Sequence, residues 1–450
     1  MKQSCRLSLF MLSLFMTICA LPLSGCSGGW FGAEEDEPLT GTRVSVLQFE
    51  KALTADPAAA SAPIDLGPVF DNQYWPQVGG YSVHSLQNVA LPTGSLSALW
   101  DADIGNGSHA SAPLITQPIA AFGFVFTLDT DGEVRAFDAK TGKQKWAIDT
   151  TKENDAGVYG GGIAAADDTL YITNGTRAVL AVNPKDGALI WRKSLPTPSR
   201  TAPTVLDERL YVMTLDHQLI ALSVQDGADL WAYQGYQGGT AILGAAAVAA
   251  HHDMVVAPFS SGELVALRPA NGSVIWSDQL TPAARYGGPS RITDLKALPI
   301  IDKGTVTAVS YAGRTVMIDE RTGARIWQRD VGGLETPALS PSHLFMITGD
   351  QNLIAIDRMN GSIKWVKSLP AYKNMEERKG PLLWTGPLLA GDRLIVLSGT
   401  GTLMQINPSD GTIITQQETD IESASPFIVA DKILYILDQD GTLNAFGRKE

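Results

Sequence analysis

Cysteine is scarce in this sequence and is confined to its start. The three cysteines are Cys5, Cys19 and Cys26, so no disulfide can form among the residues that follow. This excludes the small secreted domains that depend on disulfides for stability. Basic residues are also in deficit, with 34 Lys and Arg against 47 Asp and Glu and a net charge of −13. Because nucleic-acid binding needs clustered positive charge, we expect no nucleic-acid partner.

Long apolar runs are almost absent, which excludes a protein with many membrane-spanning helices. The one such run, residues 7–21, follows the basic residues Lys2 and Arg6 and is too short for a stable span. It leads to Leu-Ser-Gly-Cys at residues 23–26, the pattern of a bacterial lipobox. We therefore expect a signal peptide over residues 1–25 and lipid attachment at Cys26. The alternative is an ordinary signal peptide with an incidental cysteine.

The residues after Cys26 have the composition of a tether. They carry the acidic run Glu34–Glu37 and are then rich in Ala and Pro. Such a segment buries too little apolar area to order itself. The sequence therefore predicts a flexible, acidic, Ala/Pro-rich tether over residues 26–70 and one folded domain over residues 71–450. Ser27, directly after the lipobox, favours sorting to the outer membrane.

The body of the chain consists of repeats. A Gly followed four residues later by Trp recurs with a period of about 45 residues. Each unit contains four short apolar runs, which we name strands a to d, separated by turns rich in Asp and Gly. Eight positions align, seven of them Trp and the eighth Thr415. The seven are Trp100, Trp146, Trp191, Trp231, Trp276, Trp327 and Trp365. The pattern predicts an all-β, eight-bladed β-propeller with each Trp packed between adjacent blades.

The two ends of the repeat array are incomplete in complementary ways. The last unit ends near Phe446 after a strand c, whereas residues 97–101, around Trp100, read as a strand d without a blade. We therefore expect the N-terminal strand to complete the blade of residues 423–446. This closure leaves the ring without an open edge.

No motif for catalysis or metal binding stands out. Residues 129–132 and 438–441 resemble the start of a calcium loop but lack its later ligands, and Asp-Gly is also a favoured hairpin turn. His251, His252 and Asp253 fit a solvated turn. Residues 160–162 are a Gly triplet that precedes a strand, which argues against a phosphate site. We expect no catalytic, cofactor-binding or metal-binding residue.

The loops that join strand d to the next strand a are the variable part of the repeat. Those after Trp276 and Trp365 are about twice as long as those after Trp191 and Trp327. All of these d–a loops emerge on one face of the ring. Irregular additions to one face of a rigid scaffold are typical of partner binding.

The repeat resembles the PQQ-type (pyrroloquinoline quinone-like) propeller unit, as in Phe-Asp-Ala-Lys-Thr-Gly-Lys-Gln-Lys-Trp at residues 137–146. The resemblance covers residues 97–447. Quinone dehydrogenases of this fold are longer, carry a disulfide between adjacent cysteines and hold calcium. Because no cysteine pair follows Cys26, we expect no quinone cofactor.

The lipobox, tether and eight-bladed ring together resemble the BamB family of outer-membrane assembly lipoproteins. The resemblance implies a non-enzymatic scaffold in the β-barrel assembly (BAM) machinery, attached to the outer membrane by its lipid and facing the periplasm. Its implied partners are the POTRA region of BamA, other subunits of that machinery and unfolded outer-membrane proteins. Two alternatives remain, namely a periplasmic PQQ-dependent quinoprotein enzyme and another interaction or adhesion lipoprotein.

The resemblance also implies which residues contact BamA. In the family these contacts come from two neighbouring d–a loops. Arg200, after Trp191, matches the Arg of one loop. Arg291 and Asp294, after Trp276, match the other, although Lys296 stands where the family has an acid. Arg285 is a further candidate in the same loop. We expect Arg200 and Arg291 to be exposed.

Overall fold

The computed structural model describes residues 53–59, 61, 63–152, 159–236, 246–280, 294–422 and 425–448. Every regular element in these ranges is a β-strand. No helix there has the length and apolar character needed to cross a membrane. The predicted signal peptide, Cys26 and the first half of the predicted tether lie outside the described residues.

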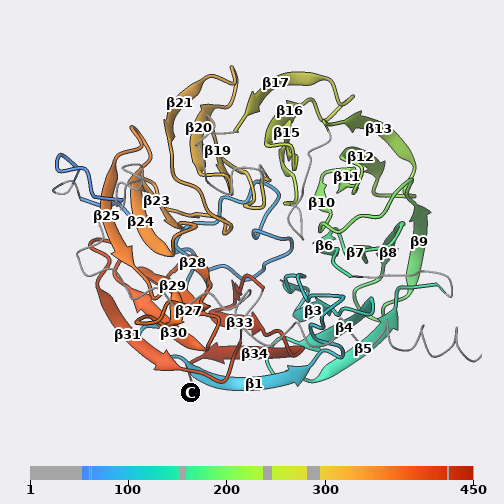
Figure 1. Ribbon diagram of the computed structural model, residues 1–450. Coiled ribbons are helices and arrows are strands. Elements are labelled where there is room, and N and C mark those ends of the chain that lie inside the picture. The colour runs from blue at the N-terminus through green and yellow to red at the C-terminus, as the bar shows by residue number, and fades with distance from the viewer. Residues whose placement is uncertain are drawn as a thin grey trace, which may run out of the picture. The chain divides into compact units, whose positions relative to one another are not determined.

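The strands form eight four-stranded antiparallel sheets around a central axis, which confirms the predicted eight-bladed propeller (Figure 1). We number the blades along the chain. Blades 1 to 3 contain β2 (Ile119–Ala121), β3 (Phe124–Leu128), β4 (Glu133–Asp138), β5 (Gln144–Asp149); β6 (Gly162–Ala166), β7 (Thr169–Thr173), β8 (Ala178–Val182), β9 (Leu189–Ser194); and β10 (Thr204–Leu206), β11 (Arg209–Met213), β12 (Gln218–Ser223), β13 (Asp229–Gln234).

Blades 4 to 6 repeat this order of strands. They contain β14 (Ala249–His251), β15 (Met254–Pro258), β16 (Glu263–Leu267), β17 (Val274–Gln279); β18 (Ile300–Asp302), β19 (Thr305–Ser310), β20 (Arg314–Asp319), β21 (Arg325–Arg329); and β22 (Ala338–Leu339), β23 (His343–Ile347), β24 (Asn352–Asp357), β25 (Ile363–Ser368).

Blade 7 is regular and blade 8 is split between the two ends of the array. They contain β28 (Trp384–Ala390), β29 (Arg393–Ser398), β30 (Thr402–Ile406), β31 (Ile413–Glu418); and β32 (Ile428–Ala430), β33 (Ile433–Leu437), β34 (Thr442–Gly447), β1 (Ser97–Asp103). A separate hairpin pairs β26 (Tyr372–Asn374) with β27 (Lys379–Pro381) in the loop between blades 6 and 7.

The closure of the ring is as predicted. β1 lies antiparallel to β34 as the outer strand of blade 8, with Trp100 opposite Ala445 and Asp103 opposite Thr442. The order within this sheet is β1-β34-β33-β32, so a strand from before the first blade completes the last one. The ring is thereby fastened by backbone hydrogen bonds between residues more than 300 positions apart.

Burial follows from the position of each strand in its blade. In blade 3 the four central residues of β12 are all buried, because this strand lies between two neighbouring blades. The outer strand β13 instead alternates between exposed and half-buried residues. The apolar runs of the sequence therefore mark strands a to c, and the mixed runs around each Trp mark strand d.

The repeated Gly and Trp act across the junctions between blades. Trp276 of blade 4 lies against Gly323 in the c–d turn of blade 5, where a Cβ would come within 2.6 Å of the Trp side chain. Gly323 also has a φ of +73°, which residues with a Cβ rarely adopt. Six Trp rings donate an indole N–H to a carbonyl of the next c–d turn at 2.7–3.0 Å; the acceptors are Pro184, Val224, Pro269, Glu320, Arg358 and Pro408.

The remaining two junctions explain the exceptions in the repeat. Trp100 of blade 8 packs on Gly142 of blade 1, where Tyr435 donates its hydroxyl to the Ala139 carbonyl. Thr415 of blade 7 faces the split blade 8. That blade has no c–d turn, because its outer strand comes from the N-terminal side of the ring. A Trp at position 415 would therefore lack the Gly and the carbonyl that the other junctions provide.

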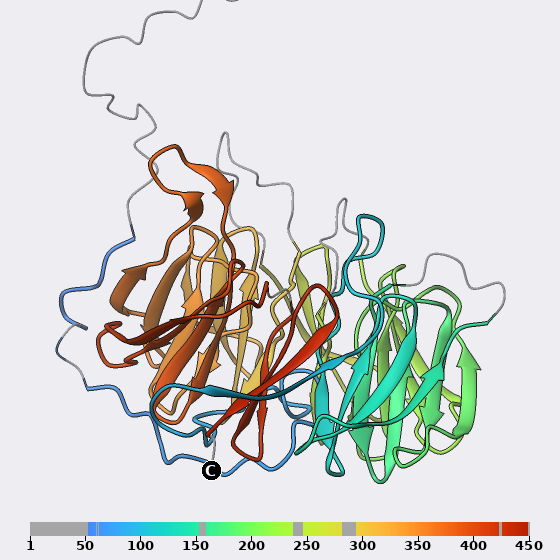
Figure 2. The ribbon, with the colours of Figure 1, turned by 90° about the horizontal axis from the view of Figure 1, so that it is seen from below.

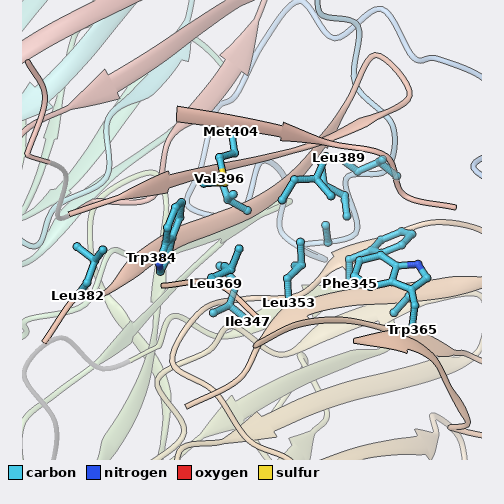
Figure 3. Close-up of a cluster of buried hydrophobic side chains, with 14 residues drawn as sticks. Phe345, Ile347, Leu353, Trp365, Leu369, Leu382, Trp384, Leu389, Val396 and Met404 are labelled. Carbon is cyan, nitrogen blue, oxygen red and sulfur yellow. The ribbon is translucent and has the colours of Figure 1, made fainter. Parts of the chain in front are cut away.

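Apolar side chains fill the spaces between blades. Between blades 6 and 7, Phe345 and Trp365 lie with ring centroids 6.1 Å apart, and Leu353, Leu389 and Val396 pack beside them (Figure 3). These three aliphatic side chains are at most 2% exposed. Such a junction contributes through buried area, at about 25 cal/mol for each Å² removed from water.

Residues 63–91 cross one end of the central channel and bind to every blade. Their backbone and side chains hydrogen-bond to the inner strands or a–b turns; the partners are Val429, Ala120, Ala165, Val205, Ala250, Ile301, Ser342 and Leu389. Figure 2 shows this segment, in blue, beneath the ring. We call residues 70–91 the plug, because they close that end of the channel.

The folded body begins earlier than predicted. The Asp56 carboxylate accepts a hydrogen bond from the Ile363 N–H of blade 6 at 2.7 Å. It also pairs with Arg329 of blade 5 at 3.2 Å. Residues 53–59 therefore lie against the ring, although composition predicted a flexible tether to residue 70. The Ala- and Pro-rich segment is ordered by bonds to the ring and not by a core of its own.

Candidate functional site

The face that carries the d–a loops is the predicted partner face. The loop between blades 6 and 7 forms the β26–β27 hairpin, with Tyr372 opposite Pro381. This hairpin stands above the ring on the side opposite the plug (Figure 2). Met375 at its tip is 57% exposed. One of the two long d–a loops is thus a projecting hairpin with an apolar tip.

Arg200 is not placed as predicted. It is half-buried, and its guanidinium lies 3.8 Å from the centre of the Tyr159 ring. Its Nε is buried and has no hydrogen-bond partner in the described part of the chain. Arg200 lines the central cavity and is therefore not a freely exposed surface residue.

Of the other three predicted contact residues, only Asp294 lies in the described part of the chain. Arg285 and Arg291 lie outside the described residues. Asp294 is only 2% exposed, and its backbone carbonyl accepts the Tyr311 N–H at 3.1 Å. Lys296, the departure from the family pattern, lines the central cavity.

The central channel holds a cavity of about 200 Å³ on the side of the d–a loops. Its floor is formed by plug residues that include Trp75 and His84, and its wall by the residues that lead into strand a of all eight blades. Figure 1 shows the inner strands around this axis. The described residues of the wall include Arg200, Lys296 and Glu335, which come from three different blades.

Burial alters the ionisation of two residues in this cavity. Burial raises the pKa of Glu335 to about 7, although Lys296 and a hydrogen bond from the Gly386 backbone favour the carboxylate. Burial also lowers the pKa of His84 to about 4, so this imidazole is neutral at physiological pH. Its Nδ1 lies 2.8 Å from the Pro299 carbonyl, which assigns the proton to that nitrogen.

The sequence contained a weak signal for this cavity. Arg200, Lys296 and Glu335 each stand two or three residues before an aligned Pro: Pro203, Pro299 and Pro337. Equivalent positions of a propeller repeat converge on one axis. One residue from each unit is inconspicuous along the chain, and the convergence becomes visible only when the repeats are aligned at this Pro.

The Asp-Gly turns have a structural role. The Asp129 carboxylate accepts the backbone N–H groups of Asp131 and Glu133 within its own turn, and Asp438 accepts that of Thr442. No group of three or more His, Cys, Asp or Glu suited to a metal ion occurs in the described ranges.

The predicted solvated turn at His251 is partly a contact between blades. His251 Nε2 lies 2.5 Å from a carboxylate oxygen of Glu320 in blade 5, and both side chains are mostly covered. His252 pairs with Asp207 of blade 3 at 2.9 Å, and its side chain is 78% exposed. The turn therefore helps to join blade 4 to its two neighbours.

Comparison with known proteins places the ring among assembly factors. A curated relative from Yersinia pestis, "Outer membrane protein assembly factor BamB", is 26% identical over 79% of this chain and 89% of its own. The crystal structure of BamB from Moraxella catarrhalis covers 79% of this chain and 100% of its own, with a TM-score of 0.67 and 18% identity.

The fold is also similar to that of enzymes. The quinohemoprotein alcohol dehydrogenase from Comamonas testosteroni matches 84% of this chain and 81% of its own, with a TM-score of 0.65 and 12% identity. At such identity the likeness establishes the fold alone. The family model described as "Outer membrane protein assembly factor BamB" matches residues 89–159, 130–367 and 373–450. Because these ranges span nearly the whole ring, the chain belongs to the BamB family of PQQ-repeat outer-membrane protein assembly factors.

Proposed function

We propose that this protein is a non-catalytic scaffold subunit of the outer-membrane β-barrel assembly machinery. The observation that carries the proposal is the family match along nearly the whole ring. In this proposal Cys26 carries the lipid that holds the protein to the outer membrane, and the ring faces the periplasm. Its partners are the periplasmic POTRA region of BamA, other subunits of the machinery and unfolded outer-membrane proteins.

The d–a face is the proposed partner surface. The hairpin of β26 and β27 adds structure to that face, and Met375 and Leu383, 57% and 61% exposed, provide apolar area beside charged residues. An apolar centre with a polar rim is typical of protein interfaces. Arg285 and Arg291 are proposed as direct contacts, since Arg is favoured at energetic centres of interfaces.

Arg200 and Asp294 have a different part in this proposal. Both side chains are at least half covered, so we assign them to positioning the loops and not to the main contact. Arg200 does so through its contact with the Tyr159 ring. Charge reversal at either position is therefore a poor test of the interface, because it also disturbs packing.

A catalytic quinoprotein is the competing assignment, and the similarity to a dehydrogenase fold is the observation behind it. Calcium is bound by six to eight oxygen ligands, which include Asp and Glu carboxylates, carbonyls and waters. The described part of the chain has no cluster of three such side chains. The described residues thus give no support to a calcium-assisted quinone site.

The test is site-specific photocrosslinking in intact cells. A photoreactive residue replaces Met375 at the hairpin tip, and the matched control replaces Met359, which is 81% exposed in a c–d turn at the opposite face. We expect an adduct with the periplasmic region of BamA from position 375 and none from position 359. Equal adduct yields from both positions, or none from either, contradict the proposed partner face.

A further inference from the structure

The central cavity contains hydrogen-bond donors without partners. Arg200 and Lys296 both line it, and neither forms an ion pair in the described part of the chain. The Arg200 Nε and the Trp75 indole nitrogen are buried without an acceptor there. A buried donor left unpaired costs about 1–3 kcal/mol. Two cations that line one cavity without an ion pair among the described residues point to an anion that comes from outside the chain.

We propose that the central cavity binds a small organic anion, namely a carboxylate with an apolar body. The carboxylate pairs with Arg200 and Lys296, and the apolar part lies against the side chains of the plug and the wall. This inference goes beyond the proposed scaffold function and does not depend on it.

The geometry of Arg200 suits the recognition of a carboxylate. Stacking on Tyr159 at 3.8 Å holds the plane of the guanidinium. A fixed guanidinium presents two parallel N–H groups to a carboxylate, which a flexible ammonium cannot do. Lys296, from another blade, then adds a second positive charge. The two cations outnumber the single acid of the cavity, Glu335, among the described lining residues.

The remaining wall suits an apolar body. Leu86 of the plug, Leu298, Leu388 and Phe427 line the same cavity. Its volume of about 200 Å³ has room for on the order of fifteen non-hydrogen atoms, given about 10–15 Å³ of such space for each water-sized group. Small-molecule sites combine apolar walls with a few convergent polar groups in this way.

Glu335 makes the proposed binding sensitive to pH. The charged or titratable side chains among the described lining residues are Arg200, Lys296, His84 and Glu335. His84, with a pKa of about 4, remains neutral between pH 6 and pH 8. Glu335, with a pKa of about 7, loses its proton across that range. The resulting carboxylate repels the ligand and competes for Lys296, so affinity falls as pH rises.

The experiment is calorimetric titration of the full protein in detergent with phenylpropionate. The matched control probe is phenylpropionamide, which has the same body without the charge. We expect phenylpropionate to bind at least about tenfold more tightly than the amide, as a charge-assisted hydrogen bond implies. Equal affinity for the two probes, or no heat from phenylpropionate at pH 6, overturns the proposal.

Single substitutions test whether phenylpropionate binds in the central cavity. Lys296→Met is expected to weaken phenylpropionate binding roughly tenfold, whereas Arg321→Met, which removes an exposed charge in a c–d turn at the other face, leaves it unchanged. Glu335→Gln removes the acid without loss of volume and is expected to give at pH 8 the affinity that the unmodified protein shows at pH 6. Unchanged pH dependence in a folded Glu335→Gln protein contradicts the assignment.

Discussion

Replacement of one glycine by alanine tests the contact that joins the blades. In Gly323→Ala, the new Cβ meets Cβ and Cγ of Trp276 at 2.6 Å. Because the Cβ of Trp276 is fixed by the backbone of β17, a change of the Trp276 rotamer cannot relieve the clash with that atom. The left-handed φ of +73° adds a cost of about 1–2 kcal/mol for any residue with a Cβ. Overpacking adds about 1–3 kcal/mol, so we expect a total loss of about 2–5 kcal/mol.

Gly304 in the same blade provides the matched control. Its φ is +79°, but an added Cβ meets no atom within 4 Å. Gly304→Ala therefore carries the backbone cost alone, about 1–2 kcal/mol. Urea unfolding monitored by tryptophan fluorescence measures the free energy of unfolding of both variants. The two variants are expected to have comparable m-values, so their midpoints can be compared directly. Equal unfolding midpoints for Gly323→Ala and Gly304→Ala would refute the junction model.

Three further predictions concern the ends of the chain and the cavity. Deletion of residues 1–52 is expected to leave the melting temperature unchanged. Deletion of residues 1–105 removes the plug and β1 and is expected to lower the melting temperature strongly, because the ring opens. Equal melting temperatures for the two truncations contradict this closure. Cys26→Ala is expected to release the protein from the membrane fraction, and full membrane retention of a processed variant argues against the lipid anchor. The pKa of Glu335 is raised to about 7 in the folded state, so its stabilising effect is present at low pH and is lost as pH rises through 7. Glu335→Gln should therefore raise the melting temperature at pH 8 relative to the unmodified protein, with little gain at pH 4.5, and an equal gain at both values contradicts the assigned pKa.

The regular part of the fold was predictable because its determinants are periodic. Gly323 packs at the junction of blades 4 and 5, and Trp327 packs at the junction of blades 5 and 6. Because the two residues recur at a fixed spacing in each unit, they reveal the repeat. In the third unit the four apolar runs, at residues 202–206, 210–215, 218–222 and 228–233, agree with β10 to β13 to within about two residues. The split blade was also predictable, because a strand was missing at one end of the array and surplus at the other.

The plug and the cavity were not predictable in the same way. Residues 70–91 have no period of their own, and their conformation depends on carbonyls and N–H groups of seven separate blades. Asp56 likewise acquires its partners Arg329 and Ile363 only in the folded ring. The family pattern predicts that Arg200 is exposed. Its position beside Tyr159 depends instead on how adjacent loops converge at the channel.

The most direct test of the proposed function is purification of the tagged, full-length protein from detergent-solubilised outer membranes, followed by identification of the proteins that accompany it. We predict that BamA co-purifies in stoichiometric amount, and that Arg285→Glu combined with Arg291→Glu reduces its recovery while Arg321→Glu does not. A hot-spot pair of this kind is worth about 2 kcal/mol or more in binding free energy. Recovery of the folded protein from the outer membrane without BamA would contradict the assignment to the assembly machinery.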